Sequence, residues 1–326
     1  MATPVPYEVI PIKSREDWLD TRNTGIGGSD AAAVVGVSQF KSPLKLWMEK
    51  TGAVEPDDLS EQKNVKWGNL IEPILASEYA RLHPGVKVKR KNAVLRSKDH
   101  PFMLATLDRT VMCPERGRGG WEGKTTGWFA GQSWGDESDP SSVPDAYQLQ
   151  VQHYMAVTGW DFFDVSGLIG GQDDRHYTIL RDQDVIDALV EAEGRFWQMV
   201  QDCVMPDLTG AADESSALLA LFPKASEEVL DLSTATAIQL AEQHVAAKRT
   251  IEQADAIRKK CASELKALMG DHSKATAGAA TITWSKFTKK KVDLAAITAQ
   301  APDLVAAATT EVPSDRFVVT PPKASK

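Results

Sequence analysis

Between residues 43 and 204 the sequence alternates between helical and strand patterns. The segment "KSPLKLWMEKTG" is typical of a short helix. Ser42 suits the N-cap, Pro43 the first helical position and Gly52 the position past the C-terminal end. The predicted elements are helices over 43–51 and 64–83, strands over 86–96, 102–112 and 120–126, a helix over 145–158, strands over 161–171 and 175–181, and a helix over 182–204. This order predicts an α/β domain with a mixed central sheet flanked by helices.

The chain is long enough for more than this one domain. With 326 residues and an apolar fraction of 42%, it suits one large domain with an appendage, or two domains. No apolar run approaches the roughly 20 residues of a membrane helix. The segment "MATPVPYEVIPIKSRED" lacks a basic start followed by an apolar core, and the three cysteines lack C-x-x-C spacing. We therefore expect no signal peptide, no membrane partner and a cytoplasmic location.

The character of the sequence changes beyond about residue 225. Residues 234–269 contain no Gly or Pro, which predicts one long helix. The apolar residues expected to form its packing stripe are Ile251, Ala254, Ile257, Cys261, Leu265 and Leu268. Strands are predicted over 281–287 and 315–320, which could pair with each other. Lys286 and the lysines at 289–291 could contact the DNA backbone, but solvated charge is the preferred interpretation. We predict a domain over residues 1–215 and a mostly helical C-terminal extension over residues 216–326 without catalytic groups.

The fragment "GGWEGKTTG", residues 119–127, places an acid and an amine two positions apart. Residues i and i+2 of a strand point to the same face, so Glu122 and Lys124 project together with the Gly123 carbonyl between them. One interpretation is a surface ion pair, which contributes little to stability. The other is a metal ligand beside a catalytic ammonium, and the rest of the sequence has to decide between them.

Two further acids precede this fragment. Asp108 lies near the end of the strand before it, so the hairpin can place Asp108 beside Glu122. Glu72 lies within the apolar helical segment "WGNLIEPIL", where a carboxylate is costly unless it is paired or binds a metal. The alternative for Glu72 is a half-exposed acid.

Together with the Gly123 carbonyl, these three acids would form a site made only of oxygen ligands. Such ligands suit Mg²⁺ or Mn²⁺ rather than Zn²⁺. Lys124 would then contact the attacking water or the phosphate. These groups are the ones that metal-assisted phosphodiester hydrolysis requires.

The N-terminal segment "TRNTGIGGSDAAAVVGV" adds a separate signal for phosphate. Glycines precede Ser29, where an apolar helix is predicted to begin, and helix N-termini bind anions. Arg22, seven residues earlier, could hold the same phosphate through two hydrogen bonds. The G-K-[ST] ending of a P-loop is absent, and an ordinary capped turn is the alternative.

The net charge of the chain is compatible with a nuclease. A net charge of −8 argues against a simple DNA-coating protein, but a carboxylate site and a local basic groove are compatible with it. Basic residues are dense over 87–98, as they would be either in such a groove or on an edge strand protected by lysines.

The ordered motifs resemble a known family. They are Arg22 followed by "GGSDAA", then "SPLKLWMEKTG", "WGNLIEP", "ATLD", "WEGK" and "YQLQVQHYMAVTG". This set resembles the YqaJ-type viral recombinases and is similar to lambda exonuclease, within the PD-(D/E)xK nuclease superfamily. The resemblance covers about residues 15–205 and is specific as an ordered set, although each motif alone is weak.

The resemblance implies a PD-(D/E)xK core and a Mg²⁺-dependent 5′-to-3′ exonuclease, with Mn²⁺ able to substitute. Such enzymes act on double-stranded DNA ends, leave a 3′ single strand for a phage annealing protein, and form ring-shaped homotrimers. A phage or prophage origin in a bacterial host cytoplasm is implied too.

The resemblance also implies roles for individual residues. The metal ligands are Asp108, Glu122, the Gly123 carbonyl and Glu72. The catalytic lysine is Lys124, and a helix glutamine near the active site matches Gln152, with Gln150 as the second choice. The pocket for the 5′-phosphate matches Arg22, Ser29 and Thr106.

The sequence departs from the family pattern at two positions. Leu107 replaces the usual proline before the first acid, and Gly123 replaces a branched aliphatic residue. Proline supplies no ligand, whereas glycine keeps the carbonyl but loosens the strand. Two other functions stay open: a structure-specific endonuclease of the same superfamily, and a non-catalytic protein that binds DNA ends. Intact Asp108, Glu122 and Lys124 argue against the non-catalytic protein, and the exonuclease is the leading interpretation.

Overall fold

The structure, a computed structural model, describes residues 5–57, 59, 61–224, 226, 228–289, 292–310, 317 and 319. The chain forms two compact units divided between Pro223 and Lys224. The division comes slightly after the predicted residue 215 because helix α7 (Glu214–Leu221) packs on the first unit through the buried Ala217. None of the helices in the described ranges has the length and apolar character to cross a membrane.

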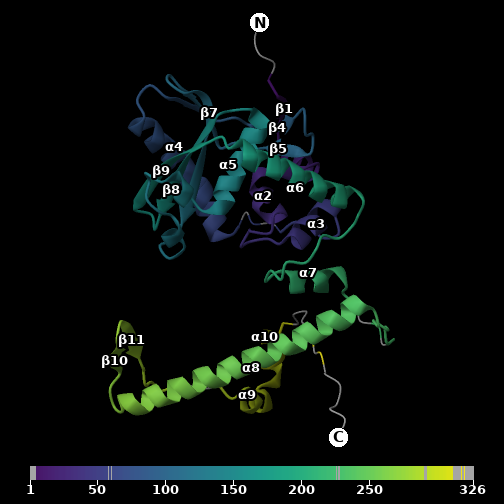
Figure 1. Cartoon of the computed structure of the whole chain (residues 1–326), viewed down its shortest axis with the longest axis vertical. Helices are drawn as coiled ribbons and strands as arrows, with labels where there is room; N and C mark the ends of the chain where they lie inside the picture. The colour runs from purple at the N-terminus through teal and green to yellow at the C-terminus, as the bar shows by residue number, and fades with distance from the viewer. Residues whose placement is uncertain are drawn as a thin grey trace. The chain divides into compact units, whose positions relative to one another are not determined.

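The first unit carries the mixed α/β architecture that the sequence predicts (Figure 1). Its elements are β1 (Tyr7–Pro11), α1 (Arg15–Asn23), β2 (Ile26–Gly27), α2 (Gly28–Val34), α3 (Pro43–Thr51), α4 (Lys63–Leu82), β3 (Lys87–Lys89), β4 (Ala93–Ser97), β5 (Met103–Ala105), β6 (Arg109–Cys113), β7 (Gly117–Thr126), η1 (Ala130–Ser133), η2 (Pro140–Ser142), α5 (Asp145–Thr158), β8 (Phe162–Ile169), β9 (Asp173–Leu180), α6 (Gln183–Gln201) and α7.

Two sheets form the framework of this unit. The five-stranded sheet has the order β3-β6-β7-β8-β9, in which β7 and β8 are parallel and the other neighbours antiparallel. The four-stranded sheet has the order β1-β4-β5-β2, in which only β2 and β5 are parallel. Both sheets are therefore mixed.

Two of the predicted strands are wrong in extent. The segment predicted as one strand over 86–96 forms β3 and β4, and the segment over 102–112 forms β5 and β6. In both cases the halves belong to different sheets. Each interruption contains a residue that is depleted in strands, Asn92 or Asp108. The second interruption leaves Thr106 and Asp108 in the link between the sheets.

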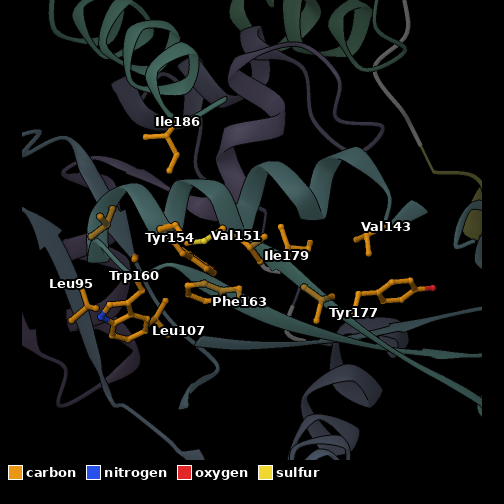
Figure 2. Close-up of a cluster of buried hydrophobic side chains, with 14 of the residues drawn as sticks. Leu95, Leu107, Val143, Val151, Tyr154, Trp160, Phe163, Tyr177, Ile179 and Ile186 are labelled. Atoms are coloured by element: carbon orange, nitrogen blue, oxygen red, sulfur yellow. The ribbon is translucent and has the colours of Figure 1, made fainter. Parts of the chain in front are cut away.

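Helices cover both faces of the five-stranded sheet. Phe162 packs with Leu75 and Tyr79 of α4, whereas the next residue, Phe163, packs with Val151 and other residues of α5. Successive strand residues point to opposite faces, so α4 and α5 lie on opposite sides. Figure 2 shows the α5 side, where Val151, Tyr154 and Phe163 lie together between helix and strands.

The second unit is built on one long helix. It contains α8 (Ala235–Met269), β10 (Lys274–Ala277), β11 (Ala280–Thr283), α9 (Leu294–Gln300) and α10 (Pro302–Ala308). α8 confirms the long helix predicted over 234–269, and Thr234 caps it by accepting a hydrogen bond from the Ala237 amide. The apolar side chains of Ile251, Ile257 and Leu268 are exposed, so the described residues of this unit do not cover the predicted stripe.

The first of the two strands predicted for the extension is present in part, and its described pairing is with a strand that was not predicted. β11 is shorter than the predicted 281–287 and pairs with the preceding β10. Gly278 adopts a positive φ of 59° in the link between β10 and β11, which allows this local hairpin. Of the segment 315–320, only Phe317 and Val319 are among the described residues, and Lys290 and Lys291 lie outside them.

Candidate active site

The β6–β7 hairpin places Asp108 opposite Glu122. Arg109 is the register partner of Trp121, so the residue before Arg109 faces the residue after Trp121. The backbone N–H of Gly123 donates to Asp108 Oδ2 at 3.0 Å. Asp108 and Glu122 therefore lie beside each other, as the sequence predicts. The hairpin register and this hydrogen bond keep them there.

Glu122 and Lys124 point together toward α5, as the strand periodicity predicts. Lys124 Nζ donates to Glu122 Oε1 at 2.8 Å and lies 4.9 Å from the ring centre of Tyr147, in the first turn of α5. The Glu122 side chain is only 4% exposed and the Lys124 side chain 21%. An exposed surface ion pair, the simpler interpretation of the fragment, does not describe a pair this deep in the protein.

Burial raises the pKa of both acids. Burial, and then the negative charge of Asp108, raise the pKa of Glu122 to about 7. Burial also raises the pKa of Asp108, although Lys124 and the Gly123 amide oppose the shift. Burial disfavours the charged form of Lys124, but the two carboxylates outweigh it and raise the pKa of its ammonium. The site therefore concentrates negative charge that one ammonium offsets only in part.

The donor set fits a hard divalent cation. Glu122 Oε2 is buried and has no hydrogen-bond partner among the described residues. A buried carboxylate oxygen in this condition is costly, and a bound cation would satisfy it. Asp108, Glu122 and the Gly123 carbonyl together offer oxygen ligands of the type that Mg²⁺ and Mn²⁺ prefer.

Glu72 does not join these two acids in the structure. Its carboxylate forms an ion pair with Arg109, whose side chain is 10% exposed. Within the described ranges, no three Asp, Glu, His or Cys side chains gather into a metal site. The predicted three-acid cluster is therefore absent from the described residues, where the Glu72 carboxylate is paired with the guanidinium of Arg109. Burial, and then the charge of Asp108, still raise the pKa of Glu72, so the two acids influence each other.

The predicted order of the two glutamines is reversed. Gln150 Nε2 donates to Glu122 Oε1 at 2.7 Å, so Gln150 is the helix glutamine beside the acids. Gln152 Nε2 instead donates to the carbonyl of Leu180, and its Oε1 accepts from the Asp182 amide. Gln152 therefore joins the end of β9 to the start of α6. Positions two apart on a helix lie on different faces, so only one of them can reach Glu122.

The glycine at position 123 has a steric reason. A Cβ atom at Gly123 would lie 2.6 Å from Cη2 of Trp121, which is fully buried on the α4 side of the sheet. The indole fills the space that a side chain at position 123 would need. Trp121 Nε1 also donates to Ser166 Oγ at 2.9 Å, which holds the ring in place.

Gly123→Ala should therefore lower the free energy of unfolding by about 1–3 kcal/mol, the usual range for an overpacked core. Urea denaturation measures this. Gly127→Ala is the matched control, since a Cβ at Gly127 meets nothing within 4 Å. Equal stability of the two variants would mean that Trp121 yields freely.

Glu122→Gln should stabilise the metal-free protein at pH 8. The pKa of Glu122 rises from its ordinary 4.5 to about 7 on folding, so the wild type loses stability as the pH rises through this interval. Removing this titratable group should raise the free energy of unfolding by roughly 2–3 kcal/mol at pH 8 and change it very little at pH 4.5. Thermal unfolding with a chelator measures the difference, and the exposed Glu55→Gln is the control. An unfolding midpoint at pH 8 no higher than that of wild type would contradict the expectation.

The residues predicted to hold a phosphate also come together. Arg22 donates through one nitrogen, NH2, to Ser29 Oγ and to Asp30 Oδ1, both at 2.9 Å. Its guanidinium carbon lies 5.2 Å from the ring centre of Trp18, whose Nε1 donates to Thr106 Oγ1 at 3.4 Å. Trp18 thus connects Thr106, in the link between the two sheets, to Arg22 at the end of α1.

Sequence reasoning missed two buried charges behind Arg22. Asp30 and Lys50 each have side chains 3% exposed, and Lys50 Nζ lies 3.2 Å from Asp30 Oδ2. Lys50 also donates to the backbone carbonyl of Arg22 at 2.9 Å. Burial would raise the pKa of Asp30, but Arg22 and Lys50 outweigh it and hold that pKa well below its usual range. Asp30 stands in the quoted "GGSD" motif, whereas nothing near Lys50 in the sequence indicates burial.

Comparison with known proteins agrees with these motifs. Residues 17–161 match the family described as the YqaJ-like viral recombinase domain. The chain is 32% identical over 298 residues to a protein from Bacillus subtilis (strain 168) named "Uncharacterized protein YqaJ", and the match covers 89% of each chain.

Two crystal structures of exonucleases are more distant. An alkaline exonuclease from Laribacter hongkongensis is 17% identical, with a TM-score of 0.44 over 63% of this chain and 99% of that one. A phage-related exonuclease from Haemophilus somnus 129PT is 14% identical, with a TM-score of 0.40 over 57% of this chain and 99% of that one. On the strength of the YqaJ match along nearly its whole length, the protein belongs to the YqaJ-like viral recombinase family.

Proposed function

We propose that the protein is a metal-dependent deoxyribonuclease, a 5′-to-3′ exonuclease that shortens linear duplex DNA and leaves 3′ single strands. The observation that carries the proposal is the buried pair Asp108 and Glu122, with Lys124 beside it and one Glu122 oxygen without a partner. Structural ion pairs rarely leave a buried carboxylate oxygen unsatisfied. Membership of the YqaJ-like viral recombinase family adds support that is independent of this geometry.

In this mechanism Asp108, Glu122 and the Gly123 carbonyl would hold Mg²⁺, or Mn²⁺ in its place. Bound Mg²⁺ would supply Lewis acidity toward the water and the phosphodiester. Lys124 remains charged at neutral pH because its carboxylate neighbours raise its pKa, so it can stabilise negative charge developing on the phosphate. Gln150 orients Glu122 by its hydrogen bond. Glu72 would take part only after leaving Arg109.

The phosphate pocket is the basis for the proposed 5′-to-3′ polarity of cleavage. Arg22, Ser29 and Thr106 would bind the terminal 5′-phosphate, so cleavage would begin at a 5′ end. Arg22 Nε and NH1 have no acceptor among the described residues and are available for this contact. Asp30 holds the remaining nitrogen, so the guanidinium is oriented before a ligand arrives.

The resemblance to lambda exonuclease extends the proposal to assembly and partners. We propose a ring-shaped homotrimer that encloses the duplex and passes the 3′ strand to a phage annealing protein in the host cytoplasm. Sedimentation of the full chain would report the oligomeric state. A stable monomer at the concentration of the activity assay would argue against the ring.

The decisive experiment incubates the protein with Mg²⁺ and either linear or covalently closed circular duplex. An exonuclease digests only the linear DNA and releases nucleotides from its 5′ ends. Cutting of the circle would favour the structure-specific endonuclease. Binding to ends without digestion, in Mg²⁺ and in Mn²⁺, would favour a non-catalytic end-binding protein.

A further inference from the structure

The inference concerns Lys50, the buried lysine that lies behind Arg22 and has no role in the mechanism above. It stands in the last turn of α3, and its side chain is only 3% exposed. Its ammonium nitrogen lies 3.2 Å from Asp30 Oδ2 and donates to the backbone carbonyl of Arg22 at 2.9 Å. A lysine is almost never buried to this extent unless it is paired, so the identity of its partners is informative.

Stability alone does not account for a buried ammonium at this position. Burial lowers the pKa of Lys50, and the negative charge of Asp30 opposes that shift. Taking both charges out of water costs free energy, which their attraction offsets only when the geometry is favourable. Apolar residues of similar volume often replace buried ion pairs without loss of stability, so the pair is weak evidence of a purely structural role.

Lys50 holds Arg22 at both ends of the residue. The carbonyl of Arg22 is among the last four of α1, which an α-helix leaves without a regular partner, and Lys50 supplies one. The side chain of Arg22 donates to Asp30 Oδ1, and the other oxygen of that carboxylate faces Lys50. The lysine therefore fixes the backbone of Arg22 directly and its guanidinium through Asp30.

Lys50 also changes the charge of the pocket. Arg22 and Asp30 alone would form a neutral pair, which attracts an anion only weakly. With Lys50 the group contains two cations and one anion, so it is positive. The neighbouring Lys41 and Glu49 pair with each other and leave this balance unchanged. Arg22, with 31% of its side chain exposed, is the member of the group through which the excess charge reaches a ligand.

We propose that Lys50 is a positioning residue of the phosphate pocket, which neutralises Asp30 so that Arg22 keeps its positive charge for the terminal phosphate of the DNA. The lysine is too deeply buried to contact the phosphate itself and acts through the other two residues. Without it, Arg22 would be committed to Asp30 as a neutral pair. The inference rests on the proposed function in one respect, since it takes Arg22 to be the residue that binds the 5′-phosphate.

The test compares the binding of two labelled duplexes that differ only in the 5′-terminal phosphate. Fluorescence anisotropy with the full-length protein, without divalent cations, measures both affinities and requires no cleavage. Lys50→Met keeps an unbranched side chain and removes the charge. It should lower the ratio of the two affinities by about tenfold, the lower end of what a charge-assisted hydrogen bond contributes. Loss of folded protein changes both titrations alike and leaves their ratio unaffected.

A double variant distinguishes neutralisation of Asp30 from simple packing. Asp30→Asn with Lys50→Met removes both buried charges together and leaves Arg22 as the excess cation, so it should recover most of the preference for the phosphorylated end. If Lys50 only filled space in the core, the double variant would be no better than Lys50→Met. A double variant that recovers nothing would therefore overturn the inference, as would an unchanged ratio in Lys50→Met.

Lys45→Met is the matched control, because it makes the same substitution in the same helix. Lys45 is partly exposed and pairs with the exposed Asp57, so its loss should leave the ratio of affinities unchanged. Equal affinities of the wild type for the two duplexes would overturn the phosphate pocket and the inference with it. Loss of the preference in Arg22→Ala but not in Lys50→Met would overturn the inference alone, so the two failures are recognised separately.

Discussion

Lys124→Ala should lower the rate of DNA cleavage by about two to three orders of magnitude while the protein still binds DNA ends. The ammonium is largely buried beside Glu122 and acts on charge that develops only in the transition state, so its loss should reduce kcat rather than raise KM. Single-turnover digestion of an end-labelled duplex at saturating Mg²⁺ measures the rate, and fluorescence anisotropy measures end binding.

The same variant separates the lysine from the acids. Lys124 is a cation that competes with metal for Glu122, so Lys124→Ala should bind Mn²⁺ at least as well as wild type. Asp108→Ala should lose both cleavage and Mn²⁺ binding. Lys13→Ala is the control, an exposed lysine outside the site. Turnover within a few-fold of wild type in Lys124→Ala would remove the lysine from the mechanism.

The pair Asp108 and Glu122 could be found from the sequence because the information is local. An i, i+2 spacing fixes Glu122 and Lys124 on one face, and a short turn fixes the hairpin that brings Asp108 opposite. The division of the strands was not predictable in this way. β4 pairs with β1 and β5 with β2, contacts between residues far apart along the chain. A single Asp108 or Asn92 within an apolar run does not indicate that the run leaves one sheet for another.

The glutamine assignment failed for a different reason. α5 is buried around most of its surface, and Gln150 and Gln152 are 5% and 6% exposed. A helix with apolar residues on all sides gives no periodicity from which to tell the face toward Glu122 from the face toward β9. Lys50 was missed because lysine is nearly always exposed, and its burial depends on its contacts with Asp30 and with the Arg22 carbonyl. The positions of Gln150 and Lys50 depend on how helices and strands pack against one another, which the composition and spacing of the sequence do not indicate.

Arg22→Ala should abolish the preference for 5′-phosphorylated ends that we expect of the wild-type protein. A charge-assisted contact from Arg22 contributes about 1.5–3 kcal/mol, so phosphorylated ends should be digested roughly 10- to 100-fold faster than 5′-hydroxyl ends. Without the guanidinium the two rates should converge. Arg22→Lys should recover only part of the preference, because a single ammonium nitrogen cannot match a guanidinium that bonds Asp30 through one nitrogen and keeps two further nitrogens for the phosphate.

The experiment compares initial rates on two duplexes that differ only in the 5′-terminal phosphate. Arg195→Ala is the control, since this arginine is exposed and pairs with the exposed Glu191. Arg22→Ala also leaves the buried Asp30 with Lys50 as its nearest cation, so its unfolding midpoint should fall and the assay belongs below that temperature. Because both ends are tested with the same variant, a loss of folded protein lowers both rates and leaves their ratio unchanged. A ratio near one in the wild type would refute the phosphate pocket, and a preserved ratio in Arg22→Ala would assign it to other residues.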